Sequence, residues 1–232
     1  MPTSNLDFYI VSGNIVIFSG EHSEKFKNDI LHSSLTGHLV AEANSTNSDE
    51  VWSTYTKTVA DLSWVTCSLD QTNTRSNEES LYTISLQAYG DVLSKNDRQT
   101  LDRAFSVLKE QPKDSPSILA LTTRFNAHTT TSYQDNKKGD TSEKKTSTGI
   151  LLTFINHEKI VHTLRITIES GQYLDIGILN NPVLDTTNKD DFNTWLLSST
   201  FDESTYEDLR VEVDAYLDDS ITAEIIRIQD SR

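Results

Sequence analysis

The stretch GILLTFINHEKIVHTLRITIES, residues 149–170, decides the fold class that the sequence predicts. It holds two runs rich in β-branched and large apolar residues, 149–155 and 159–169, separated by only three residues. Such residues favour strands, and a connection this short makes the two strands antiparallel neighbours. A third run of similar composition, 172–179, follows two residues later. The stretch therefore predicts an antiparallel meander.

Further strands are predicted on both sides of this meander, where short apolar or β-branched runs are bounded by turn residues. They are expected at residues 6–11, 14–18, 51–59, 62–69, 81–89, 118–125, 209–217 and 221–228. Gly13 and Asn14 offer the positive φ that the tight turn of the first hairpin needs. Within 62–69, Cys67 shares the more apolar face with Val65 and Leu69, so the sequence places it in the core.

Three helices are predicted, near residues 22–34, 95–110 and 189–199. The second has the strongest signals, because Ser94 and Asp97 can cap its first turn together. Its apolar stripe consists of Leu101, Ala104, Phe105 and Leu108. Together with the strands, these helices predict an α+β fold: an antiparallel-rich mixed sheet, built from hairpins and meanders, with about three helices packed on it.

The chain is expected to form one globular unit over residues 1–232. A proline-flanked segment leaves open two intimately packed halves, 1–113 and 117–232. The stretch 134–147 has no aliphatic residue to bury, so a mobile hairpin loop is expected there. Its four lysines make it a basic loop in an acidic protein. They are Lys137, Lys138, Lys144 and Lys145.

The chain has 35 acidic and 20 basic residues, a net charge of −15 and an isoelectric point near 4.7. A nucleic-acid backbone would repel such a surface, so no nucleic-acid partner is predicted. Cys67 is the only cysteine, so no disulfide can form within the chain and a reducing compartment is indicated. With no signal peptide and no transmembrane segment, a cytoplasmic protein is expected; export by a signal-less route is left open.

No catalytic signature is present, and the sequence predicts no catalytic residue, no cofactor and no metal site. Dinucleotide-binding, P-loop and nucleophile-elbow motifs are absent. His157 and His162 lie in or next to a predicted strand at an odd spacing, which would point their rings to opposite faces rather than toward one metal ion. Because a catalytic site can be assembled in space, a hydrolase-type enzyme stays open as an alternative.

The function that the sequence favours is a non-catalytic acidic accessory protein: a chaperone-like protein, an immunity-like protein, or an accessory factor of a toxin or of secretion. It would bind a protein partner with a basic or apolar surface, and the binding would be sensitive to salt. The predicted partner site is the acidic C-terminal region. Its residues are Glu207, Asp208, Glu212, Asp214, Asp218 and Asp219. The sequence leaves the oligomeric state open.

A β pore-forming or membrane-active protein is the first alternative, with the hairpin at residues 126–148 as the inserting arm. A spanning strand needs ~9–11 residues with an apolar set on one face. Along 118–133 the apolar character fades toward the tip, and Thr146, Ser147 and Thr148 after the tip are polar. The sequence therefore ranks this alternative below the accessory protein and does not favour a membrane partner.

Overall fold

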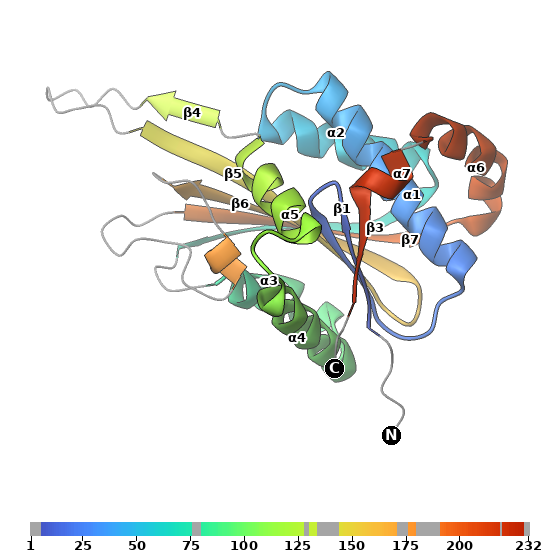
Figure 1. Ribbon diagram of the computed structural model, residues 1–232, viewed down its shortest axis with the longest axis horizontal. Helices are drawn as coiled ribbons and strands as arrows, with labels where there is room; N and C mark the ends of the chain where they lie inside the picture. The colour runs from blue at the N-terminus through green and yellow to red at the C-terminus, as the bar shows by residue number, and fades with distance from the viewer. Residues whose placement is uncertain are drawn as a thin grey trace, which may run out of the picture.

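A mixed β-sheet lies between two layers of helices (Figure 1). The computed structural model describes residues 6–75, 80–127, 130–133, 144–170, 176–179, 191–218 and 220–229. The strands are β1 (Asp7–Val11), β2 (Asn14–Phe18), β3 (Trp64–Arg75), β4 (Thr130–Tyr133), β5 (Lys144–Ile155), β6 (Ile160–Ser170), β7 (Asp191–Phe201) and β8 (Ile225–Ile228). The helices are α1 (Glu24–Asn44), α2 (Ser48–Asp61), α3 (Leu81–Tyr89), α4 (Lys95–Glu110), α5 (Pro116–Ala127), α6 (Glu203–Leu217) and α7 (Ser220–Glu224), with 3₁₀ turns η1 (Gly90–Val92) and η2 (Ile176–Leu179).

The strand order along the sheet is β3-β7-β6-β5-β2-β1-β8, and β4 pairs with the first residues of β5. β2 and β5 run parallel, whereas the other neighbouring pairs are antiparallel. This architecture confirms the predicted α+β class with its antiparallel-rich mixed sheet. Strands from the two predicted halves interleave, since β3 lies against β7 and β2 lies against β5.

Each face of the sheet has its own set of helices and its own apolar core. α1, α2 and α6 cover one face, the upper one in Figure 1, and α3 and α4 cover the other (Figure 1). The first core contains Phe26 of α1 and Tyr55 of α2, both fully buried. The second contains Phe105 of α4, Leu121 of α5 and Phe154 of β5. The sheet is therefore the middle layer of three.

Several predicted elements are confirmed. β1, β2, β5 and β6 lie where strands were expected. The first hairpin turns through Ser12 and Gly13, which both have positive φ. α4 has the complete capping box, because Ser94 accepts from the backbone of Asp97 and Asp97 accepts from that of Ser94. α1 confirms the first predicted helix but extends ten residues farther, to Asn44.

Five segments predicted as strands are wholly or partly helical instead. They are 51–59 in α2, 81–89 in α3, 118–125 in α5, 209–217 in α6, and the first part of 221–228 in α7. In α2, Asn47 caps the helix by accepting hydrogen bonds from the backbone of Asp49 and Glu50. Packing of the regularly spaced Val51, Tyr55 and Val59 then overrides the strand propensity of a threonine-rich segment.

The alternation that suggested a strand at 209–217 does not reflect burial. Val213 is buried, whereas Val211 is 78% exposed on the outer side of α6. Tyr206, Val213 and Leu217 recur at helical spacing and face the sheet. Asp202 starts the helix by accepting hydrogen bonds from the backbone of the residues two and three positions on.

The helix predicted at 189–199 is wrong, because residues 191–201 form β7. This strand lies between β3 and β6. Phe192 and Leu196 enter one core and Leu197 enters the other. A strand buried on both faces lacks the polar–apolar alternation by which strands are recognised. Of the strand predicted at 172–179, residues 176–179 form η2 and the rest lies outside the described residues.

Candidate functional site

Four neighbouring strands, β5, β6, β7 and β3, form a continuous antiparallel segment of the sheet, here called the four-strand segment. They contain 12, 11, 11 and 12 residues respectively. A tilted strand needs ~9–11 residues to cross the hydrocarbon core of a bilayer. Each strand of the segment is therefore long enough to span a membrane.

The face of the four-strand segment that points toward α3, α4 and α5 is mostly apolar on β5, β6 and β7. β3 adds only polar side chains to this face, namely Ser68, Asp70 and Thr72. The apolar side chains of the face are Ile150, Leu152 and Phe154 on β5, Leu164, Ile166 and Ile168 on β6, and Phe192 and Leu196 on β7. Strand alternation places the members of each strand on the same side. His162 and Ser198 interrupt this face near one end, where the imidazole Nδ1 lies 2.9 Å from the serine hydroxyl.

The opposite face, under α1 and α2, mixes aliphatic residues with a buried polar cluster. Asn14 donates to the Thr153 hydroxyl at 3.0 Å, and Thr153 lies 3.3 Å from the Thr163 hydroxyl. The hydroxyls of Ser34 on α1 and Tyr55 on α2 are 3.2 Å apart and extend the cluster. Burial raises the pKa of Tyr55 to about 12, so its hydroxyl stays neutral and can donate. The two faces of the same strands thus differ in chemistry.

A few hydrogen bonds link the helices over the apolar face to the sheet and to the residues that follow its strands. Tyr89, the last residue of α3, donates from its hydroxyl to the carbonyl of Leu152 at 2.8 Å. Ser19, which follows β2, donates to the buried carboxylate of Asp97 in α4 at 2.6 Å. Between these points the contact is made by apolar side chains. Apolar packing is non-directional, and a hydrocarbon phase can replace it.

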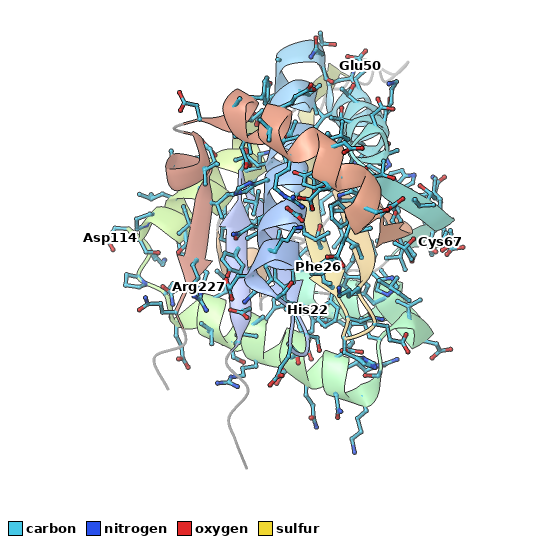
Figure 2. All side chains as sticks on the ribbon, turned by 90° about the vertical axis from the view of Figure 1, so that its right-hand side faces the viewer. His22, Phe26, Glu50, Cys67, Asp114 and Arg227 are labelled. Atoms are coloured by element: carbon cyan, nitrogen blue, oxygen red, sulfur yellow. The ribbon has the colours of Figure 1, made fainter. Side chains whose placement is uncertain are left out.

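β3 forms one edge of the sheet and pairs only with β7 among the described strands. Its residues from Val65 to Asn73 are exposed, including Leu69 at 58%. The prediction that Cys67 lies in the core is wrong, because this residue sits at a register irregularity and is exposed. Figure 2 shows Cys67 at the rim of the molecule.

Of the six carboxylates predicted to bind a partner, the five that the structure describes lie on or next to α6, not on a strand. Glu207 forms ion pairs with Lys25 of α1 and Arg210 of α6, and these two cations hold its pKa at about 2. Asp214 accepts from His32 of α1 at 2.8 Å. Asp208, Glu212 and Asp218 are exposed, and Asp219 lies outside the described residues. Part of the predicted site thus holds α6 against α1, and partner binding by the exposed carboxylates remains a prediction.

The predicted basic loop is described only at its end. Lys137 and Lys138 lie outside the described residues, whereas Lys144 and Lys145 begin β5. β4 pairs with this part of β5, from Thr130 opposite Ser147 to Tyr133 opposite Lys144. Within the hairpin proposed as a membrane arm, β4 and the first residues of β5 form an antiparallel pair, and this pair projects from the body of the molecule (Figure 1).

Two buried histidines, His38 and His162, and the partly buried His22 each have a ring nitrogen without a partner among the described residues. His38 lies on α1 and its ring packs against Tyr55 of α2. Neither of its ring nitrogens has a partner among the described residues, and the residue is 1% exposed. His162 lies on the apolar face, and His22 stacks on Phe26 with ring centroids 5.3 Å apart (Figure 2). Burial lowers the pKa of all three, most strongly that of His38, where the positive charge of Arg124 adds to the effect.

Lowering the pH from 7.5 to 5.5 is expected to reduce the free energy of unfolding, with His38 contributing the largest share. Because its folded-state pKa lies below 6.5, the unfolded chain binds a proton that the folded chain excludes. The loss of unfolding free energy that comes from His38 begins near pH 6.5 and grows toward acid by at most ~1.4 kcal/mol per pH unit. Asp202 and Glu207, with pKa values of about 2, stay ionised throughout this window.

Urea unfolding of the protein and of His38→Phe at both pH values measures this effect. The variant keeps a ring against Tyr55, whose ring centroid lies 4.6 Å from that of His38. Its stability should change less between the two pH values. An equal change in both proteins would show that His38 does not cause the acid sensitivity.

The described part of the chain contains neither a metal-binding cluster nor a membrane-spanning helix. No group of three or more histidine, cysteine, aspartate or glutamate side chains within it could hold a metal ion. His157 lies in the turn before β6 and His162 within that strand. No helix of the described residues is both long and apolar enough to cross a membrane.

Among known proteins, this chain is similar to several solved structures. No family model and no curated protein matches the sequence. The Evf virulence factor matches with 9% identity and a TM-score of 0.43, over 90% of this chain and 82% of that one. A delta-endotoxin matches with 10% identity and a TM-score of 0.40, over 83% and 84%. Activated Cyt2Ba monomer from Bacillus thuringiensis subsp. israelensis matches with 12% identity and a TM-score of 0.41, over 82% and 99%.

These matches correct the predicted function. The three matched chains are a virulence factor, a delta-endotoxin and an activated Cyt2Ba monomer, so the interpretation as an accessory protein is wrong on this comparison and is not retained. At such identities and TM-scores, no activity is transferred from them to this chain. The membrane-active alternative is therefore argued from the residues of this chain alone.

Proposed function

We propose that this protein acts on membranes by turning the apolar face of its four-strand segment toward lipid. The observation that supports the proposal is the difference between the two faces of strands that are each long enough to span a bilayer. A spanning sheet needs one apolar face for lipid, and its other face can be polar. β5 and β6 have this pattern, with Ile150, Leu152, Leu164 and Ile166 on one face and Thr153 on the other.

For this to happen, α3, α4 and α5 must leave the apolar face. Exposing that face to water is unfavourable, whereas transferring it from helices to hydrocarbon keeps it out of water. The opening requires loss of the Tyr89–Leu152 and Ser19–Asp97 hydrogen bonds and of the ion pair between Arg124 of α5 and Glu42 of α1. Backbone pairing within the sheet is retained, so no buried N–H or C=O group of the central strands loses its partner.

The opposite face can keep its helices during this change. α1 and α2 are held there by the polar cluster around Asn14, Thr153 and Tyr55, and α6 is held by its ion pairs to α1. A hydrocarbon phase cannot replace these contacts, because it offers no hydrogen-bond partner. The layer that separates is therefore the one over the apolar face.

The proposal predicts an alternating pattern of lipid contact along β6. Single cysteines are placed in a Cys67→Ser background as Leu164→Cys, Ile166→Cys and Ile168→Cys on one face, and Thr163→Cys and Thr167→Cys on the other. Each is labelled in urea with a small environment-sensitive fluorophore, refolded, and mixed with liposomes that carry nitroxides on their acyl chains. Labels at the three aliphatic positions should be quenched by at least about twofold more than those at the two threonine positions, because adjacent strand residues face opposite sides.

Release of a trapped dye from the same liposomes shows which labelled variants remain active. Neutral liposomes should release more dye than anionic ones, because a chain of net charge −15 is repelled by an anionic surface. Equal quenching at all five positions would contradict the assignment of faces. Absence of both dye release and quenching with neutral liposomes would overturn the proposed function.

A further inference from the structure

A small cavity lies where α1, α2 and α5 meet the sheet, and its chemistry is unlike that of the rest of the molecule. It has a volume of about 30 Å³, close to the space of one water molecule. Arg124 of α5, Arg165 of β6 and His38 of α1 line it, together with Trp52 of α2. None of the described residues that line it is acidic, although the chain as a whole has 35 acidic residues.

The two guanidinium groups are buried and have their acidic partners on the outer side. The Arg124 side chain is 12% exposed and pairs with Glu42, and burial lowers the pKa of Arg124 to about 10. The Arg165 side chain is 4% exposed and donates to Asp49 at 2.6 Å, while Asp49 itself is 82% exposed. Glu42 and Asp49 do not line the cavity, whereas both guanidinium groups do, so the two arginines place positive potential beside it.

His38 supplies an independent sign that the cavity has an occupant. Both of its ring nitrogens are buried without a partner in the described part of the chain. Leaving a buried donor or acceptor unsatisfied costs about 1–3 kcal/mol, so such groups are normally satisfied by protein, water or an ion. The imidazole lines the same cavity as the two guanidinium groups.

The β1–β2 turn keeps Arg124 in place. A Cβ atom added to Gly13 would lie 2.3 Å from the Cβ of Arg124, and Gly13 has a φ of +79°. Any other residue here would displace the arginine from the cavity and would adopt a strained backbone conformation. The approach of Arg124 to the cavity therefore depends on this glycine.

We propose that the cavity is a binding site for a small inorganic anion of about the size of a halide ion, held by Arg124, Arg165 and His38. The space of about 30 Å³ suits an ion close to the size of one water molecule. The anion would receive hydrogen bonds from the guanidinium groups and from one ring nitrogen of the histidine. By joining side chains of α1, α5 and β6, it would link the helices to the sheet.

Thermal unfolding of the full chain in different sodium salts at constant ionic strength tests the site. Without a specific site, gluconate should stabilise at least as well as bromide, because weakly hydrated anions favour burial least. With the site, bromide at about ten times its dissociation constant should raise the Tm by about 3–6 °C relative to gluconate. Arg165→Gln should abolish this difference, whereas the matched Arg227→Gln should retain it, because Arg227 pairs with Asp7 at an exposed position far along the sheet.

Anomalous diffraction from bromide-containing crystals of the unchanged protein provides a second measurement that does not depend on the folding of any variant. A bromide peak between Arg124, Arg165 and His38 is the expected result. A cavity that contains water alone at high bromide, or a Tm that is no higher in bromide than in gluconate, would overturn the assignment. Neither result decides the membrane proposal, because none of the apolar side chains that would face lipid lines this cavity.

Discussion

Arg210→Met is expected to lower the free energy of unfolding by about 3–5 kcal/mol, because it leaves a buried carboxylate without its cation. Arg210 of α6 donates from Nε and Nη2 to the two carboxylate oxygens of Asp29 on α1, at 2.8 Å each. Asp29 is only 2% exposed. These paired hydrogen bonds raise the pKa of Arg210 above its ordinary value. Urea unfolding monitored by tryptophan fluorescence measures the loss.

Two further variants separate the ion pair from the general effect of removing a charge. Asp29→Leu combined with Arg210→Met should recover most of the stability, because no unpaired charge then remains buried. Arg227→Met removes an arginine of which about half is exposed, and it should cost no more than ~1 kcal/mol. A single Arg210→Met variant that loses less than this control would show that α6 is not held by the pair.

Phe154→Ala should be equally destabilising, by about 3–5 kcal/mol, through loss of apolar burial and creation of a cavity. Phe154 is fully buried on the apolar face, and its ring centroid lies 6.2 Å from that of Tyr89 on α3. For a chain of this size such a loss lowers the Tm by roughly 10 °C. The matched control is Leu69→Ala on β3, which is 58% exposed and should change stability by less than about 0.5 kcal/mol.

Two spectroscopic measurements of urea unfolding also test the three-layer arrangement. Trp52, Trp64 and Trp195 all belong to the side of α1 and α2, so their fluorescence reports on that layer. Far-UV circular dichroism reports on all the helices. In Phe154→Ala the circular dichroism transition should begin at lower urea than the fluorescence transition, because the α3–α4–α5 layer loosens first. A Phe154→Ala variant with coincident transitions and wild-type stability would show that this residue does not anchor the layer.

The sequence predicted the elements whose signals are local. β5 and β6 were recognisable because both are rich in β-branched and large apolar residues and because the connection between them is short. α4 was recognisable because Ser94 and the residues after it specify a cap. These signals depend on neighbours within a few residues, so they survive without knowledge of the tertiary structure.

The elements that were missed depend on distant partners. β7 is a strand because β3 and β6 flank it, and α2 is a helix because Val51 and Tyr55 pack against the sheet. Likewise, only one part of the candidate site could be predicted from the sequence. The apolar pattern of β5 and β6 was visible in the sequence, whereas the cavity combines His38, Arg124 and Arg165 from three separate elements, and no spacing rule connects them.

The pairing of β1 with β8 has a consequence for synthesis of the protein. Phe8 lies opposite Ile228 and Val11 lies opposite Ile225, so strands from near the two ends of the chain are neighbours. β1 can therefore complete its pairing only after residue 228 has left the ribosome. Contacts between such distant residues form slowly, because a very long loop must close first. The nascent chain must consequently carry an incomplete sheet while all the residues between β1 and β8 are translated, a period during which chaperones would be needed to shield it.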